Sequence, residues 1–241
     1  MTRCIHCTRC VRFINEISGD FGLGVLGRGD SMEIGTYIEE FLGDELSANI
    51  IDLCPVGALT SMPYAFTARS WELNNINSID ILDSLASSVR IDVVNNKVMR
   101  ILPNLDEDVN EDWITNKARF AYDSLNIQRL SYPKFRMCDK LVTISWGCAL
   151  TLFAAFLIYK DVNCFNCYCG SFIDLQTTLT LKGFLNTLGT SNLNFQDNFN
   201  TYFDFRFSYL LNTTLNLLEI GTIFFLLGVN LRLESPILNQ S

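Results

Sequence analysis

The stretch CIHCTRC (Cys4–Cys10), together with the dipeptide Cys54-Pro55 later in the chain, decides how this sequence is interpreted. A turn can aim three thiolates at this spacing inward, and a remote cysteine followed by proline then provides the fourth ligand of a cubane. The proline also prevents a helix from continuing through that ligand. The pattern therefore predicts one [4Fe-4S] cluster bound by Cys4, Cys7, Cys10 and Cys54.

Other interpretations of these four thiols remain open. Structural zinc usually takes two separated pairs of cysteine or histidine ligands, and a consecutive triple of cysteines is unusual for it. The thiols can also be buried without binding anything. The only histidine, His6, lies between two of the thiols. With four thiols available, we expect His6 to be exposed on the loop and not to be a ligand.

Three arginines, Arg3, Arg9 and Arg12, lie within or just beside the CIHCTRC stretch. A cluster with four thiolates is negatively charged, so nearby positive charge favours its reduced form and raises its reduction potential. The alternative is a solvated basic turn with no effect on a cofactor. The first interpretation predicts that the substitution Arg9→Ala lowers the midpoint potential of the cluster.

Composition limits the classes to which the chain can belong. The 241 residues are 49% hydrophobic and carry a net charge of −8, which excludes collagen, long disorder and coiled coil. Nine cysteines are too few for a disulfide scaffold and no signal-peptide pattern is present, so we expect a reducing compartment. Nucleic acid is not an expected partner because no basic face is visible.

Hydrophobic periodicity predicts the secondary structure of the first 130 residues. Alternating apolar residues over Val89–Leu102, with Asn95-Asn96 at the turn, indicate a hairpin within a small β-rich domain. The other elements expected here are a helix over Cys10–Ser18 ended by Gly19, a strand over Met32–Ile38, and a short helix over Glu45–Asp52 that leads into Cys54.

After a boundary at Tyr132-Pro133, helices alternate with short apolar strands, a pattern typical of a doubly wound parallel sheet. We therefore expect an α/β or α+β fold with a cluster-binding segment (1–63), a small β-rich domain (64–131) and a partial Rossmann-like domain (132–241). The elements expected in the last domain are a helix over 142–158, a strand over Val162–Cys169, a helix over Asp174–Leu188 ended by Gly189, and a strand over Thr222–Val229.

The uncharged run Leu141–Tyr159 is long enough to span a membrane. Its apolar side chains recur on one helical face, while Thr143, Ser145 and Thr151 lie off that face. We therefore expect a buried helix of the α/β domain, with a transmembrane helix as the alternative.

Two further motifs are expected to bind nothing. The segment Gly22–Gly27, GLGVLG, matches GxGxxG, but a dinucleotide-binding fingerprint follows a strand and opens a helix, whereas here a helix precedes the motif. Cys164, Cys167 and Cys169 form a second group of thiols. We expect them to be small apolar residues of a parallel strand.

A family resemblance is carried by segments around and beyond the cysteines: Thr2–Phe13, Leu26–Gly29, Gly35–Ile38, Asn49–Ser61, Tyr64–Arg69, Val98–Pro103, Arg119–Asp123, Tyr209–Thr214 and Leu227–Asn230. These segments resemble the large iron–sulfur subunit of respiratory complex I, NADH:ubiquinone oxidoreductase. The resemblance is dense to about residue 130 and sparse after it.

The resemblance implies that Cys4, Cys7, Cys10 and Cys54 hold one cluster of the electron-transfer chain between flavin and quinone. It also implies the beginning of a molybdopterin-oxidoreductase-like fold, without molybdenum or pterin. Some family members bind a further cluster through four more cysteines, but this chain has no cysteine between Cys54 and Cys138. The implied function is a one-electron relay between neighbouring iron–sulfur centres, with no substrate site in this chain.

The chain also departs from the family, whose members carry a ferredoxin domain before this point and a larger α/β domain after it. We therefore expect a split subunit in which other chains of the complex I peripheral arm supply those parts. The expected location is the matrix side of the mitochondrial inner membrane, with membrane contact only through the complex. A composition of 18 Phe and one His suggests organelle encoding. Rival functions are a zinc-binding assembly module and a fragment of a formate-dehydrogenase-type molybdenum oxidoreductase.

Overall fold

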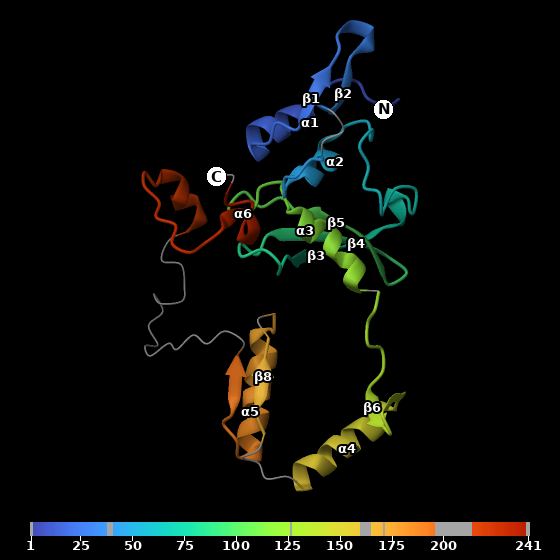
Figure 1. Ribbon diagram of the computed structural model, residues 1–241, viewed down its shortest axis with the longest axis vertical. Helices are drawn as coiled ribbons and strands as arrows, with labels where there is room; N and C mark the ends of the chain where they lie inside the picture. Colours follow the sequence, from blue (N-terminus) through green and yellow to red (C-terminus); the bar gives the residue numbers. More distant parts are fainter. Residues whose placement is uncertain are drawn as a thin grey trace. The chain divides into compact units, whose positions relative to one another are not determined.

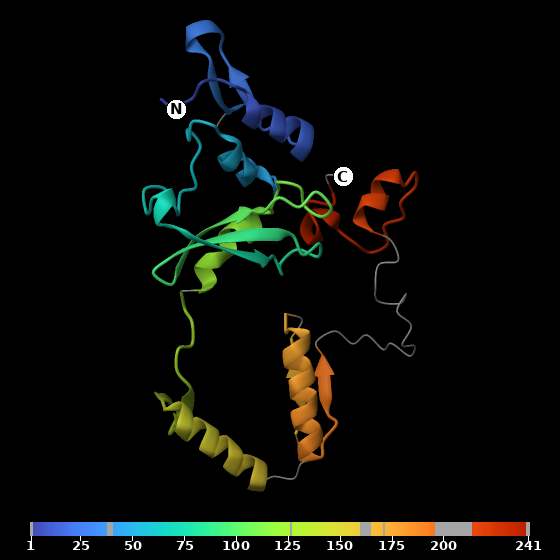
Figure 2. The ribbon, with the colours of Figure 1, turned by 180° about the vertical axis from the view of Figure 1, so that it is seen from behind.

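A computed structural model describes residues 2–37, 41–125, 127–159, 165–170, 172–195 and 214–239. The chain forms two compact units, one made of Met1–Ile127 with Leu211–Ser241 and the other of Gln128–Leu210. Figures 1 and 2 show the elements of each unit from opposite sides. The separate boundary expected between residues 63 and 64 remains a prediction.

The first unit consists of short helical turns, one hairpin and a three-stranded antiparallel sheet. Its elements are α1 (Arg9–Arg12), the π-helix η1 (Phe13–Ser18), β1 (Leu23–Leu26), η2 (Gly29–Ser31), β2 (Glu33–Thr36), η4 (Ser47–Asn49), α2 (Ile50–Leu53), η5 (Ser70–Glu72), β3 (Asn74–Ile79), β4 (Ser88–Val94), β5 (Lys97–Pro103), α3 (Asn116–Phe120), η6 (Ala121–Leu125), η9 (Leu215–Ile220) and α6 (Leu231–Glu234).

The helix expected over Cys10–Ser18 is confirmed as α1 followed directly by η1. Phe13 and Ile14 face the core, and Ile14 is 0% exposed. Gly19 ends the helix with φ of 74°, a left-handed conformation that glycine adopts without a steric penalty. The second half is a π-helix, a wider turn that the periodicity did not predict and that often occurs near functional sites.

Strands β1 and β2 form an antiparallel hairpin. The strand expected over Met32–Ile38 is confirmed over Glu33–Thr36 as β2, whereas Met32 and Tyr37 are not part of the strand and residue 38 lies outside the described residues. Four residues of the GLGVLG motif form β1, so this motif does not lead from a strand into a helix. At the hairpin turn Gly27 has φ of 74°, and a Cβ there would lie 2.5 Å from the carbonyl oxygen of Ser31, so a side chain does not fit.

The hairpin expected over Val89–Leu102 is confirmed as β4 and β5, which pair antiparallel. Asn95 and Asn96 form its two-residue turn with φ of 47° and 63°, the left-handed values that asparagine tolerates best among non-glycine residues. Strand β3 pairs with the other edge of β4. Helix α3 packs on this sheet through Ala118, which shares a small core with Val89 and Ile114.

A second core holds the cysteine-bearing segment in place. Trp113 joins it from the sheet region, because its ring centroid lies 4.7 Å from that of Phe13 at an interplanar angle of 51°. The buried members of this core are Cys10, Phe13, Ile14, Leu23, Leu46, Ile50 and Ile237. The last of these belongs to the segment after α6, so residues from both ends of the described chain close the same core.

The second unit contains a hairpin and a β–α–β arrangement. Its elements are β6 (Lys134–Met137), β7 (Lys140–Thr143), α4 (Trp146–Tyr159), β8 (Cys167–Cys169), α5 (Leu175–Leu188) and β9 (Leu193–Phe195). Strands β8 and β9 pair in parallel, and α5 connects them and runs beside them (Figures 1 and 2). The mixed α/β fold class is confirmed, with one parallel pair among the described residues.

Helix α5 follows its sequence signals closely. The Asp174 side chain caps its start by accepting a hydrogen bond from the Thr177 N–H at 3.0 Å. Gly189 ends the helix with φ of 86°, as expected. The strand expected over Val162–Cys169 is confirmed at β8, and residues 160–164 lie outside the described residues.

Three expectations for the C-terminal half are wrong. The helix predicted over 142–158 begins at Trp146, because residues 140–143 pair with β6 as β7. The strand predicted over Thr222–Val229 is an irregular segment with exposed apolar side chains, and no strand among the described residues pairs with it. Helix α4 was expected to be buried, but none of its residues is, and Ile158 is 80% exposed. Within the described residues, no helix has both the length and the apolar character needed to cross a membrane.

Candidate iron–sulfur site

Tight turns bring Cys4, Cys7 and Cys10 together at the start of the first unit. His6 and Thr8 have φ of 53° and 60°, in the left-handed region that non-glycine residues seldom adopt. The Thr8 carbonyl accepts a hydrogen bond from the Arg12 N–H at 3.0 Å, so that α1 begins at Arg9 and carries Cys10 in its first turn. Such local strain is typical of turns that aim side chains at a ligand.

Cys54 reaches the site from the end of α2, as the sequence predicted. Its N–H donates to the Ile50 carbonyl at 3.1 Å, and its own φ and ψ of −73° and 108° are already extended. Pro55 ends the helix here, and Gly57 then turns the chain back with φ of 60°. The turn places several backbone N–H groups around the Cys54 sulfur.

All four predicted cysteines line one cavity. Of the three nearby arginines, only Arg9 also lines it. His6 is partly buried and not among the lining residues, so its expected exposure on the loop is only partial. The cavity wall is otherwise apolar, formed by Ile5, Ile34, Val56, Ala58 and Leu59. An apolar wall of this kind lowers solvent access to a bound group.

Two of the sulfurs accept hydrogen bonds from the backbone. The His6 N–H donates to Cys4 Sγ at 3.4 Å, and the Ala58 N–H donates to Cys54 Sγ at 3.2 Å. Burial by itself would raise the pKa of Cys54, but the backbone N–H groups after it, led by that of Leu59, together hold this pKa below its ordinary value. The turn after Cys54 is therefore built to stabilise a thiolate.

Cys10 shows the opposite balance. Burial raises its pKa, the Val11 N–H opposes this, and the negative thiolates of Cys7 and Cys4 raise it further. Like charges held this close need a cation before all of them ionise together, and bound metal ions deprotonate coordinating thiols. The donor set thus fits a positively charged metal centre.

The four cysteines are free thiols that line one cavity. Among the described residues, no three or more histidine, cysteine, aspartate or glutamate side chains are grouped to hold one metal ion. Four thiolates are the ligand number of a [4Fe-4S] cluster and also that of a structural zinc ion.

The sheet region supports the cysteine segment through Asn49, which is 1% exposed. Its Nδ2 donates to the Ile114 carbonyl at 2.9 Å, and its Oδ1 accepts from the Ile114 N–H at 3.2 Å. Arg119 Nη2 donates to the same Oδ1 at 2.9 Å and to Asp52 Oδ2 at 2.6 Å. These bonds hold η4 and α2, and with them Cys54, against the loop before α3.

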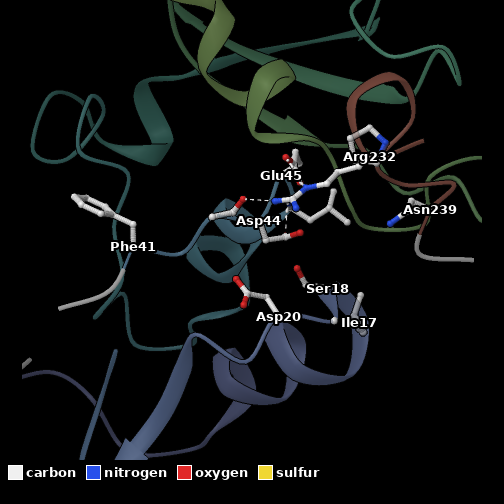
Figure 3. A pocket seen from close by; sticks show the side chains of 12 residues that line it. Ile17, Ser18, Asp20, Phe41, Asp44, Glu45, Arg232 and Asn239 are labelled. Carbon is white, nitrogen blue, oxygen red and sulfur yellow. Dashed lines mark hydrogen bonds and ion pairs between the residues drawn. The ribbon is translucent and has the colours of Figure 1, made fainter. Parts of the chain in front are cut away.

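A larger hollow of about 660 Å³ lies elsewhere in the first unit and contains no thiol (Figure 3). Arg232 of α6 crosses it and donates from Nε to the two carboxylate oxygens of Glu45 at 3.0 and 2.8 Å. Its Nη2 also donates to the Gly43 carbonyl at 2.8 Å. These bonds hold α6 against the segment before α2. Arg232 and Glu45 in the hollow therefore have a structural role.

The other thiol group behaves as expected where it is described. Cys167 and Cys169 lie in the parallel strand β8, and Cys169 is buried. Cys164 lies outside the described residues. Sequence reasoning missed the N–H donor of Ala58 and the supporting role of Asn49. The Cys-Pro-Val-Gly turn could have indicated the first, since a glycine so close to a cysteine-proline pair implies a chain reversal.

Three family models match consecutive parts of the chain. Residues 1–60 match the ferredoxin-like domain of NADH-quinone oxidoreductase subunit 3. Residues 73–123 match the NADH-ubiquinone oxidoreductase NDSU1/NuoG-like 4Fe-4S domain, and residues 129–241 match the molybdopterin oxidoreductase family. The second of these segments contains no cysteine in this chain.

Curated relatives match the chain from end to end. It is 49% identical to the NADH-ubiquinone oxidoreductase 75 kDa subunit of Acanthamoeba castellanii, over 100% of this chain and 36% of that protein. It is 46% identical to the mitochondrial 78 kDa subunit of Candida albicans, over 99% of the chain and 34% of that protein. It is also 46% identical to the 75 kDa subunit of Reclinomonas americana, over 99% of the chain and 37% of that protein. The chain, which spans about a third of the length of these relatives, belongs to the family of the 75 kDa iron–sulfur subunit of NADH–ubiquinone oxidoreductase.

Proposed function

We propose that this chain binds one [4Fe-4S] cluster through Cys4, Cys7, Cys10 and Cys54 and serves as an electron-transfer element of NADH–ubiquinone oxidoreductase. The observation that carries the proposal is the convergence of four free thiols on one cavity, in a chain related to the 75 kDa subunit. When bound, such a cluster supplies one-electron oxidation and reduction.

The residues of the chain supply position, shielding and charge. The strained turns and α2 set the positions of the sulfurs, and Ile34 and Leu59 limit access of water. The N–H groups of His6 and Ala58 and the guanidinium of Arg9 place partial or full positive charge beside the thiolates. Nothing in this function requires a substrate site or bond-making groups in this chain.

The cysteine content of residues 73–123 supports the proposal of a single cluster. The segment 73–123 lacks cysteine, so it cannot supply the thiolates that its family name implies. We likewise expect no pterin in the segment that matches the molybdopterin oxidoreductase family, because the relatives that match the whole chain are named as NADH oxidoreductase subunits. Extraction followed by pterin fluorescence checks this expectation.

The partners of the chain, on this proposal, are other peripheral-arm subunits of complex I, including separate chains that pack beside the cluster segment and on the α/β region. Exposed apolar side chains support this, since Ile5 beside the thiols and Phe153 on α4 both face solvent in the chain alone. The proposed location is the matrix side of the mitochondrial inner membrane, in line with the name of the Candida relative, and organelle encoding is in line with the phenylalanine-rich composition.

Low-temperature electron paramagnetic resonance of the native assembly tests this function. We expect NADH to produce a reduced-cluster signal that is missing when this chain carries Cys54→Ser, while the signals of other centres remain. Mass spectrometry of the same assembly identifies the neighbouring chains. A full set of NADH-reducible signals in the Cys54→Ser assembly would overturn the proposal.

A further inference from the structure

A third cavity of the first unit, of about 220 Å³, has no role in the function described above. It lies between the segment after Cys54, strand β5, and the helical turns α3 and η6. Leu59 lines both this cavity and the one that holds the thiols, so the two are neighbours. The lining of this cavity, however, contains no cysteine.

Positive charge dominates the lining, which contains Arg3, Arg100 and Arg119 but only one carboxylate, that of Asp52. Arg3 is exposed, and no hydrogen bond or ion pair joins it to another residue in the described part of the chain. Arg100 Nε donates a hydrogen bond to Asp92 Oδ2 at 2.7 Å, and the guanidinium carbon of Arg100 lies 4.6 Å from the centre of the Tyr64 ring. Both arginines therefore keep N–H donors available for a ligand.

Arg119 is the buried member of the group, with a side chain only 4% exposed. Its Nη2 bonds to Asn49 and Asp52, but its Nε is buried without a hydrogen-bond partner among the described residues. Buried guanidinium donors are normally paired, because an unpaired buried donor costs free energy. Arg119 therefore adds a buried positive charge to the wall of this cavity.

The rest of the lining is partly apolar. The apolar part of the wall is formed by Ile101 and Leu102 of β5 together with Leu59. Tyr64 and Tyr122 add aromatic rings to the lining. Tyr122 is itself buried, and no hydrogen bond joins its hydroxyl to another residue that the structure describes. The cavity thus combines positive donors, a free hydroxyl and apolar surface, as do sites for small organic anions.

We propose that this cavity binds a carboxylate attached to a small apolar or aromatic group. Planar guanidinium groups match the two oxygens of a carboxylate, and the apolar wall matches its attached group. A doubly charged phosphate fits less well, because Asp52 in the lining and Asp92 beside Arg100 already offset part of the positive charge. The ligand is either a free organic acid or an acidic residue of a neighbouring polypeptide.

Benzoate is a suitable probe, with benzamide as its neutral counterpart and inorganic phosphate as the doubly charged one. We expect calorimetry on the full chain to show binding of benzoate, with benzamide and phosphate each at least about tenfold weaker. Arg3→Gln and Tyr122→Phe should each weaken benzoate binding by about three- to tenfold. Arg28→Gln, a change at an exposed arginine outside the lining, should leave it unchanged.

Arg119→Gln is not decisive, because this residue also holds Asn49 and Asp52 and the variant can fail to fold. The exposed Arg3 does not have this problem. Benzoate binding equal to that of benzamide or phosphate, or unaffected by both Arg3→Gln and Tyr122→Phe, would overturn the proposal. Binding to the isolated chain but not to the native assembly identifies a polypeptide carboxylate as the occupant, and binding to both identifies a free organic acid. None of these outcomes depends on the cluster, so they are independent of the proposed function.

Discussion

The segments 1–60 and 73–123 both match families of iron–sulfur proteins, yet they differ in the residues that such a site requires. The first contains four cysteines, and the fold gathers all four around one cavity. The second contains none and forms the sheet β3–β4–β5 with α3. Family membership therefore describes the fold of both segments, whereas ligand chemistry must be established residue by residue.

The second segment supports the first through contacts of its side chains. Through Ile114 and Arg119 it binds Asn49, which precedes the helix that presents Cys54. Trp113 packs on Phe13 of η1, which follows the helix that carries Cys10. Loss of contacts in the second segment should thus lower stability, and loss of cysteines in the first should remove the cofactor.

The largest expected effect is that of Cys54→Ser on metal content. A serine hydroxyl is a poor replacement for a thiolate on iron, so bound iron should fall from about four per chain to near zero. Iron and acid-labile sulfide assays on the full chain measure this. Cys148→Ser, at an exposed thiol on α4, is the matched control and should retain its iron. Retention of iron by the Cys54→Ser variant would show that another ligand set holds it.

Ile14→Ala and Ile114→Ala compare the cores of the two segments directly, because both side chains are 0% exposed. Each variant should lose about 2–5 kcal/mol of unfolding free energy, measured by chemical denaturation. Ile14 shares its core with Cys10, whereas Ile114 packs with Val89 and Ala118. Under conditions where both remain folded, we expect a lower iron content for Ile14→Ala only, and equal iron loss in both would contradict the division of roles.

Asn49→Ala tests the connection between the segments. The substitution leaves the buried N–H and C=O of Ile114 without their partner and removes one of the two acceptors of Arg119 Nη2, so we expect a loss of about 2–3 kcal/mol. Asn74→Ala, at an exposed position of β3, should change stability by less than about 0.5 kcal/mol. Similar denaturation midpoints for the two variants would refute the supporting role of Asn49.

Arg9→Ala tests the charge at the thiol cavity. Loss of one partly solvated positive charge should lower the midpoint potential by roughly 20–40 mV, since the reduced cluster carries the greater negative charge. Arg28→Ala removes an exposed arginine that does not line the cavity and should leave the potential unchanged. Potentiometric titration compares the two variants. An unaltered midpoint potential for Arg9→Ala would mean that Arg9 belongs to a solvated basic turn with no effect on the cluster.

The smallest effect concerns pH and a buried carboxylate before β4. Burial raises the pKa of Asp83, the Leu85 N–H opposes this, and Asp80 raises it further. The folded state therefore holds this proton more tightly than the unfolded state, so stability falls as pH rises from the ordinary carboxyl value through the raised pKa. Asp83→Asn should reduce the fall in melting temperature between pH 4 and pH 7. Asp112→Asn, at an exposed site, is the control, and an equal effect of both would contradict the assignment.

Sequence patterns predicted the elements whose signals are local. Gly19, Gly189 and the pair Asn95-Asn96 mark chain reversals by their backbone preferences, and the structure has a helix end or a turn at each. Cys4, Cys7 and Cys10 were identifiable because they lie close together in the sequence. Cys54 is distant from them and was identifiable because Pro55 follows it. The turn after Cys54 was less visible, because its N–H donors come from the backbone and not from recognisable side chains.

The failures occurred where the outcome depends on neighbours. Residues 140–143 pair with β6, although their apolar character also suits a helix. Thr222–Val229 is apolar enough for a buried strand but pairs with no strand in the part of the chain that the structure describes. Periodicity likewise predicted a buried face for α4, whereas burial requires a second surface that this unit does not provide in its described residues. Asn49, a polar residue 1% exposed, was missed because its partners are distant in sequence.

Iron, acid-labile sulfide and zinc in the full chain, purified without oxygen, test the central claim most directly. The arrangement of Cys4, Cys7, Cys10 and Cys54 predicts iron and sulfide in equal amounts, about four of each per chain, with no stoichiometric zinc. One zinc per chain without labile sulfide would contradict the claim and make these thiols a structural zinc site.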